Sequence, residues 1–125
     1  MNNLKSILAA LIVFVASFQV LAQTPEVIKL EQTPGSFTTT ELTLKPGQYK
    51  FEVLNNGVDH EVGFVVAPKG KEKVAEAHLA QAYLTKTVVD GESAQSNVVE
   101  LTEGTYSYFC PLNPTPLYTL VVEGD

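Results

Sequence analysis

A strand that runs directly into a proline-rich loop constrains this chain more than any other feature. The strand covers residues 104–110, and three prolines follow within residues 111–116. Along the strand, Tyr106, Tyr108 and Cys110 occupy every second position, so the three side chains share one face. Proline fixes φ and removes a backbone donor, so the loop is expected to be stiff. The pattern predicts a strand whose last residue, Cys110, is held beside a rigid loop.

Cys110 is also the only cysteine of the chain. A thiolate at a strand end is a suitable ligand for a soft metal. A buried cysteine serves equally well as a small apolar core residue. In an oxidising compartment a lone cysteine cannot form an internal disulfide, so we expect it to be either buried or held by a metal. The residues alone leave both alternatives open.

The first 22 residues have the organisation of a secretory signal peptide. Lys5 supplies a positive charge, residues 7–20 are mostly apolar, and the run ends in small or apolar residues at Ala22. We predict cleavage between Ala22 and Gln23, which leaves one domain, residues 23–125. The apolar run is short for a membrane span, so no span is expected after removal of the signal. The predicted location is periplasmic or secreted.

The charge balance excludes one large class of function. The chain carries 14 acidic and 8 basic side chains, a formal net charge of −6, and it contains no arginine. Loss of Lys5 with the signal peptide makes the mature chain more negative by one unit, about −7. Binding to nucleic acid needs clustered cations, so no nucleic-acid partner is expected. The charge either steers the protein toward a basic partner or simply keeps it soluble.

Short segments rich in β-branched and aromatic residues, separated by proline and glycine turns, predict a β-sandwich. Residues 37–44 are expected to form one or two strands. The predicted strands are residues 26–31, 37–44, 49–54, 58–67, 95–101, 104–110 and 119–122. Residues 71–84 contain good helix formers and neither glycine nor proline, so they predict one helix on the surface of the sandwich.

The two histidines have different surroundings in the sequence. His60 lies at the start of the strand predicted over residues 58–67, with the parity of Val62 and Phe64, so it is expected to point the same way as these apolar side chains. Such a histidine is either a core or rim residue with one hydrogen bond, or a metal ligand. His78 falls in the middle of the predicted helix without a second ligand at helical spacing, so no site is predicted there.

Four segments together carry a resemblance to a known family. They are the strand over residues 44–53, the Asn-Asn-Gly-Val-Asp-His segment 55–60, the strand 104–110 that ends in Cys110, and the closing strand 117–122. In this order and with these gaps, they resemble the cupredoxins, the small blue-copper proteins that include plastocyanin and amicyanin. The resemblance covers nearly the whole mature domain. It implies an all-β fold, a cupredoxin-like Greek-key β-sandwich with one short surface helix.

The resemblance also implies a copper site, with departures from the family pattern. Two imidazoles, one thiolate and a weak axial thioether make up a type 1 site. His60 matches the first histidine and Cys110 matches the thiolate, whereas Asn113 stands in place of the second histidine and Pro116 in place of the axial methionine. The predicted cofactor is therefore copper in an altered site of His60 and Cys110, with Asn113 as a weak third ligand. The implied function is electron transfer or copper handling with a periplasmic redox or copper-handling partner.

A copper-free module that acts by binding a partner is the alternative. The loss of ligands at Asn113 and Pro116 favours it, because the rest of the domain is well formed. In that case the prolines of the loop would present a stiff recognition surface beside Phe109, Leu112 and Leu117. A lone cysteine is the feature that this alternative explains least well.

Catalysis at Cys110 is the third class of function. Cys110 could serve as a nucleophile with His60 as its base. No feature for binding an acyl group or stabilising an oxyanion can be named in the sequence, so we predict that the protein is not an enzyme.

Overall fold

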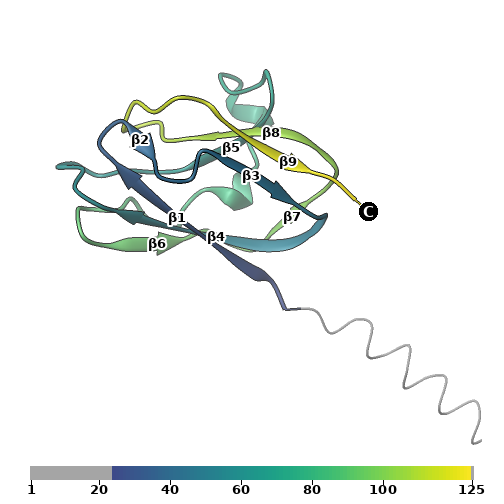
Figure 1. The fold of residues 1–125 in the computed structure, drawn as a ribbon, viewed down its shortest axis with the longest axis horizontal. Coiled ribbons are helices and arrows are strands. Elements are labelled where there is room, and N and C mark those ends of the chain that lie inside the picture. Colours follow the sequence, from purple (N-terminus) through teal and green to yellow (C-terminus); the bar gives the residue numbers. More distant parts are fainter. Residues whose placement is uncertain (1–23, 125) are drawn as a thin grey trace, which may run out of the picture.

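Two β-sheets packed face to face make up the structure, a computed structural model that describes residues 24–124 (Figure 1). One sheet has the strand order β2–β1–β4–β6, with β7 also paired to β4, and the other has the order β3–β9–β8–β5. The predicted all-β, cupredoxin-like sandwich is confirmed. The predicted signal peptide, residues 1–22, and its cleavage point lie outside the described residues and stay predictions.

Most of the strands coincide with predicted segments. Residues 37–44 and residues 95–101 each correspond to two strands. The elements are β1 (Glu26–Thr33), β2 (Ser36–Phe37), β3 (Glu41–Leu44), β4 (Gly47–Asn55), β5 (Val65–Pro68), the 3₁₀ turns η1 (Ala75–Ala77) and η2 (Ala80–Ala82), β6 (Ser93–Gln95), β7 (Val99–Leu101), β8 (Gly104–Phe109) and β9 (Tyr118–Val122). β1 pairs with β4, and β3 with β9, in parallel, whereas the other pairs are antiparallel.

Alternation along the strands places the predicted faces in the core. Tyr49, Phe51 and Val53 of β4 are buried, and Tyr108 and Cys110 are buried on the opposing sheet. Successive side chains of a strand point to opposite faces, so a period of two selects the residues that meet between the sheets. The faces predicted for these two strands are confirmed.

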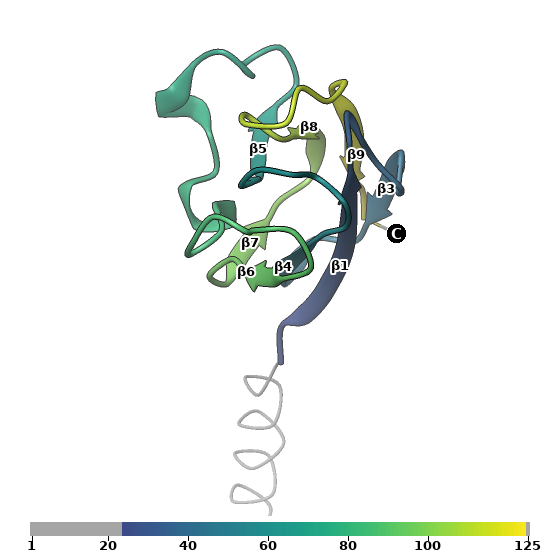
Figure 2. The same cartoon turned by 90° about the vertical axis from the view of Figure 1, so that its left-hand side faces the viewer.

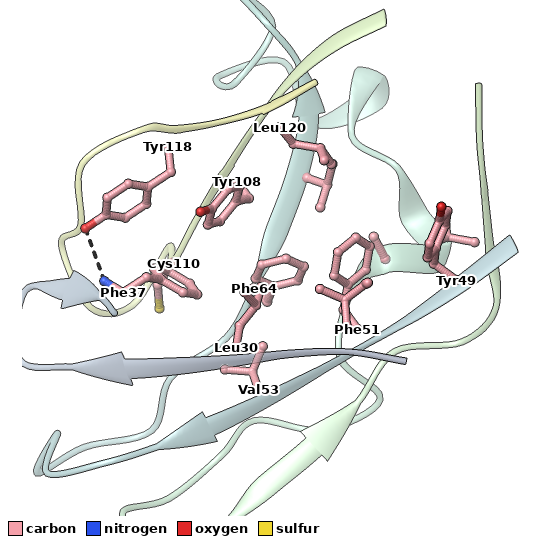
Figure 3. Packing of buried hydrophobic residues seen from close by; sticks show 14 of the residues in the cluster. Leu30, Phe37, Tyr49, Phe51, Val53, Phe64, Tyr108, Cys110, Tyr118 and Leu120 are labelled. Atoms are coloured by element: carbon pink, nitrogen blue, oxygen red, sulfur yellow. Dashed lines mark hydrogen bonds between the residues drawn. The ribbon is translucent and has the colours of Figure 1, made fainter. Parts of the chain in front are cut away.

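Aromatic rings fill the centre of the sandwich (Figure 3). Phe37 packs edge-on against Tyr108 and Tyr118, with ring centroids 5.5 and 5.6 Å apart, and Phe64 bridges toward Phe51 at 5.0 Å. The backbone N–H of Phe37 donates to Tyr118 Oη at 3.1 Å, so the short strand β2 is tied to β9 across the core. Cys110 lies at the same end of the core as Phe37, with its sulfur turned away from Tyr108 (Figure 3).

The predicted helix over residues 71–84 is wrong. The segment forms only the two 3₁₀ turns, and His78 and Leu79 between them are extended. The N–H of Leu79 donates to the carbonyl of Val66 in β5, at 2.9 Å, and therefore does not make a helical hydrogen bond. Neither turn has a side-chain cap at its start. A tertiary hydrogen bond thus overrides good helix propensity.

The same segment covers one side of the sandwich. Figure 2 shows it leaving β5 and crossing toward the strands of the other sheet. Leu84 makes an isolated bridge to Ser96, in the link between β6 and β7. Near its beginning, Glu72 Oε2 accepts a hydrogen bond from Ser107 Oγ of β8 at 2.7 Å. The segment therefore covers the outer face of β8, and Ser107 is buried on a face that alternation alone would leave to solvent.

The strand predicted over residues 58–67 is shorter than expected. Only β5 belongs to a sheet, and Val62 instead exchanges backbone hydrogen bonds with Val88 at 3.0 Å in each direction. The residues before Val62 form an irregular loop in which His60 is exposed, whereas Val62 and Phe64 are buried. The expectation that His60 points the same way as these two apolar residues is therefore wrong. No helix within residues 24–124 is long and apolar enough to cross a membrane.

Candidate functional site

Cys110 follows β8 directly and is only 4% exposed. Its Sγ accepts two backbone hydrogen bonds, from the N–H of Gly63 at 3.3 Å and from the N–H of Asn113 at 3.1 Å. The backbone N–H of Cys110 donates to Thr115 Oγ1 at 3.1 Å. The loop after β8 therefore folds back over the sulfur, whereas the stiffness expected from its three prolines stays a prediction.

Asn113 lies beside that sulfur and is 3% exposed. Its Nδ2 donates to Gln32 Oε1 and to the carbonyl of Thr33, both at 3.1 Å. Its Oδ1 accepts from the N–H of Gly35 at 2.9 Å. Both ends of the side-chain amide are therefore committed to the end of β1 and to the turn that follows it. The structure places Asn113 next to Cys110, as a buried anchor of the loop.

Gln32 completes this arrangement and was not singled out from the sequence. It is fully buried, and its Nε2 donates to the carbonyl of Gly63 at 2.6 Å. Gln32 has the parity of Ile28 and Leu30, which are the buried residues of β1. A glutamine at a position where alternation predicts burial needs buried partners. A glutamine at a position of the strand where burial is expected was therefore the sequence signal for a polar cluster at this end of the core.

His60 occupies a different environment. Its side chain is exposed, and its Nδ1 lies 2.9 Å from the carbonyl of Glu61. The loop around it is held by Asn55, whose Nδ2 donates to the carbonyl of His60 at 3.1 Å and whose Oδ1 accepts from the N–H of Val58. Among the described contacts, no hydrogen bond joins the His60 side chain to Cys110. The three predicted ligands are thus not gathered into one hydrogen-bonded cluster.

His78 lies on the outer face of the sheet. Its Nε2 is 2.7 Å from the carbonyl of Glu72, and its Nδ1 is 2.7 Å from Tyr83 Oη. A carbonyl only accepts, so Nε2 carries a proton, and in the neutral imidazole Nδ1 then accepts from the tyrosine hydroxyl. The ring also meets Phe109 edge-on, at 6.2 Å between centroids. His78 fastens the 71–84 segment to itself and to β8.

Two titratable groups near these elements have displaced pKa values. The pKa of Glu72 is lowered, first because Ser107 donates to its carboxylate and next because the N–H of Gly70 does. The pKa of Tyr108 is raised to about 12, mainly because burial disfavours the phenolate and secondarily because Tyr118 and Glu41 are nearby. Both shifts follow from packing and hydrogen bonding that stabilise the fold.

An apolar hollow lies beside the proline loop. Its volume is about 360 Å³, and its walls come from the 63–65, 83–87 and 111–112 segments. Tyr83 and Leu84 of the 71–84 segment and Pro111 and Leu112 of the proline loop belong to this lining. Leu112 is 48% exposed, although it is a large apolar side chain. Lys86 is the charged residue of the lining.

Comparison with known proteins identifies the family. A family model described as a cupredoxin-like domain matches residues 5–122. The chain belongs to the cupredoxin family. Cupredoxins are generally electron carriers, although some members of the family are enzymes. No curated protein sequence matches the chain.

Solved structures of auracyanins share the fold of this cupredoxin. Auracyanin B matches with a TM-score of 0.62 and 20% identity over 82% of this chain and 93% of its own. Auracyanin A, a blue copper protein from the green thermophilic photosynthetic bacterium Chloroflexus aurantiacus, matches with a TM-score of 0.61 and 18% identity over 80% and 100%. Dithionite-reduced auracyanin from the photosynthetic bacterium Roseiflexus castenholzii matches with a TM-score of 0.60 and 14% identity over 81% and 99%.

The described residues of this cupredoxin do not fit a type 1 copper centre. One thiol is present, His60 is exposed, and both ring nitrogens of His78 are hydrogen-bonded on the outer face. Within residues 24–124 no three histidine, cysteine or acidic side chains are grouped so that they could hold a metal ion. Pro116, in the position of the axial ligand, has no donor atom in its side chain. The altered site predicted at His60, Cys110 and Asn113 stays a prediction.

Proposed function

We propose that this chain is an exported cupredoxin-fold module that binds a protein partner through its proline loop and needs no resident copper. The apolar segment before Ala22 supports export. The family assignment supports a small carrier or adaptor rather than an enzyme. The observation that carries the copper-free part is the buried side-chain amide of Asn113.

Asn113 stands where the family pattern has its second histidine, and its amide is already occupied. Turning Oδ1 toward a metal would break the bond from Gly35 and would rotate Nδ2 away from Gln32 and Thr33. Each buried polar group left without a partner costs about 1–3 kcal/mol. Coordination by Asn113 would therefore compete with a satisfied network, and no buried side-chain polar atom of the described residues lacks a hydrogen-bond partner.

The loop itself is the surface that we assign to the partner. Leu112 and Leu117 are 48% and 56% exposed, and Pro111, Pro114 and Pro116 are exposed around them. The hollow of about 360 Å³ continues this apolar surface on one side. Contiguous exposed apolar surface on a soluble domain commonly marks a binding site. Its stiffness lowers the entropy that is lost on binding.

The charge of the chain indicates the chemistry of that partner. A net charge of −6 favours encounter with a basic protein and opposes the approach of a second copy of this chain. Apolar contacts at Leu112 and Leu117 would hold the complex, and the long-range field would accelerate its formation. The partner that we expect is therefore a cationic exported protein with an apolar contact area.

Copper binding through Cys110 is the second candidate, and one observation favours it. Two backbone N–H groups, from Gly63 and Asn113, point at Sγ. Donors of this kind stabilise negative charge on sulfur, and a thiolate is a strong ligand for Cu(I). This candidate corresponds to copper transfer or electron transfer with a copper-handling or redox partner.

A copper titration separates the two candidates. Cu(I) and Cu(II) are added separately to the purified protein in competition with a chelator, and the visible spectrum is recorded, with Cys110→Ala as control. The proposal expects no binding that depends on Cys110 and no intense thiolate-to-copper absorption. Tight binding that is lost in Cys110→Ala would contradict the copper-free proposal and establish the second candidate.

The binding surface is tested with matched aspartate variants. Proteins captured from the exported fraction of the source cells are identified, and the affinity of a candidate partner is then measured with purified components. Leu112→Asp should weaken that affinity tenfold or more, because the change removes a central apolar contact. Leu54→Asp is the control, since Leu54 is 37% exposed on β4 of the other sheet. Equal effects of both changes, or binding that is insensitive to salt, would contradict the proposal.

A further inference from the structure

The lone thiol of this protein is closed off by a small set of buried amides. Gln32 and Asn113 bond to each other at 3.1 Å, and each also holds a segment that contacts the sulfur. Gln32 binds the carbonyl of Gly63, and the N–H of the same Gly63 donates to Cys110 Sγ. Asn113 donates its own N–H to that sulfur. We infer that Gln32 and Asn113 form an amide lock that keeps the loop closed over Cys110 and protects its thiol from disulfide exchange and oxidation.

The lock joins three parts of the chain that are distant in sequence. Asn113 lies in the loop after β8, and its side chain reaches Thr33 at the end of β1 and Gly35 in the following turn. Gln32 extends the connection to Gly63, just before β5. Removing the Asn113 amide therefore releases the loop from the end of β1 and from the following turn. Removing the Gln32 amide takes away one of these three bonds and also loosens Gly63, whose N–H donates to the sulfur.

Cys110 is a cysteine whose thiol has to be kept from reagents by the loop that covers it. It is the only cysteine of the chain, so the only disulfide open to it is with another molecule. At 4% exposure, a reagent reaches the sulfur only when the loop opens. Opening by displacement of Asn113 breaks its three side-chain hydrogen bonds together. The reactivity of the thiol therefore reports how often the lock opens.

The inference deepens the proposal that the chain needs no resident copper, because the amides hold the loop that ligands would otherwise fix. The two remain separable in experiment. Thiol reactivity is measured without metal, and the copper titration is measured without a thiol reagent. Failure of one therefore leaves the other unaffected.

The test uses dithiobis(nitrobenzoate) on the purified protein. The Cys110 thiolate attacks the reagent disulfide, a mixed disulfide forms, and one thionitrobenzoate leaves and absorbs in the visible. Labelling of the wild type should be slow, and Asn113→Ala should raise its rate at least tenfold. Gln32→Met keeps the volume of the side chain, removes its amide, and should also raise the rate. Gln32→Met carries the test if Asn113→Ala does not fold.

Coupling and a matched control distinguish a lock from general loss of stability. In the double variant the rate should rise by less than the product of the two single effects, because the bond between the two amides can be lost only once. Val99→Ala, in β7 of the sheet that lacks Cys110, is the control for global stability, which is measured by urea unfolding. Rates unchanged in both single variants would overturn the inference. It would also be overturned if Val99→Ala accelerates labelling as much at equal loss of stability.

Discussion

Replacement of His78 by phenylalanine should loosen the internal structure of the 71–84 segment while the core stays intact. The change removes the bonds from Nε2 to the Glu72 carbonyl and from Tyr83 Oη to Nδ1, both 2.7 Å long. A net hydrogen bond contributes about 0.5–1.5 kcal/mol, and water partly replaces these two because His78 is only half-buried. The expected loss in the free energy of unfolding is therefore about 1–2 kcal/mol.

Comparison with His78→Ala separates hydrogen bonding from ring packing. The phenylalanine can keep the edge-on contacts with Phe109 and Tyr83, which lie 6.2 and 5.9 Å away between centroids. Alanine loses them too, at a further cost of about 1 kcal/mol. Urea unfolding gives the global effect, and hydrogen exchange at the Leu79 amide, bonded to Val66, gives the local one.

Two results would refute this account of His78. In the first, both variants keep the wild-type free energy of unfolding and the wild-type protection of the Leu79 amide. In the second, the phenylalanine variant loses as much stability as the alanine variant, which would leave nothing for ring packing to contribute. Because Tyr83 and Leu84 line the apolar hollow, a loosened segment should also weaken partner binding.

Three further predictions concern pH and backbone geometry. The pKa of Tyr108 is raised to about 12, so the tyrosine loses its proton in the unfolded state at a lower pH than in the folded state. The free energy of unfolding should therefore fall as pH rises above 10, by up to about 1.4 kcal/mol per pH unit. In urea unfolding at alkaline pH, Tyr108→Phe should show a weaker dependence of this free energy on pH. Because the pKa of Glu72 is lowered in the folded state, its carboxylate stabilises the fold above its unfolded pKa, and this stabilisation is lost as pH falls below 4.5. In the same assay, Glu72→Gln should lose less stability on acidification than the wild type. An unchanged dependence of stability on pH would count against the Ser107 contact. Gly35 has φ of +76°, so Gly35→Ala should lower the free energy of unfolding by about 1–2 kcal/mol, whereas wild-type stability would show that the turn relaxes without strain.

The sequence predicted the sheets well because alternation is a local pattern. The faces of β4 and β8 followed from residue parity, and the split of residues 37–44 into two strands was allowed for. The prediction of a helix over residues 71–84 was wrong because helix propensity depends only on the residues of the segment itself. The hydrogen bond from Leu79 to Val66, which prevents the helix, joins the segment to another part of the chain. Helix propensity sums the preferences of single residues, so it does not take account of a hydrogen bond to a carbonyl in a distant strand.

The candidate site was predicted only in part, for a related reason. The position of Cys110 at the end of a strand, next to the proline loop, could be derived from one segment of the sequence. The exposure of His60 could not, because it depends on Val62 pairing with Val88 and on Asn55 holding the loop before it. The exposure of His60 thus depends on hydrogen bonds that a pattern within one strand does not predict.

Membership of the cupredoxin family therefore fixes the scaffold of this chain more firmly than its chemistry. The two sheets and the aromatic core place the end of β1, Gly63 and the loop after β8 at one end of the sandwich, where buried side chains join them. Side chains at such a point must either bind something or satisfy one another, since buried polar groups without partners are costly. Here Gln32 and Asn113 satisfy one another and the backbone around them. Coordination of a metal by Asn113 would therefore have to displace bonds that this side chain already makes.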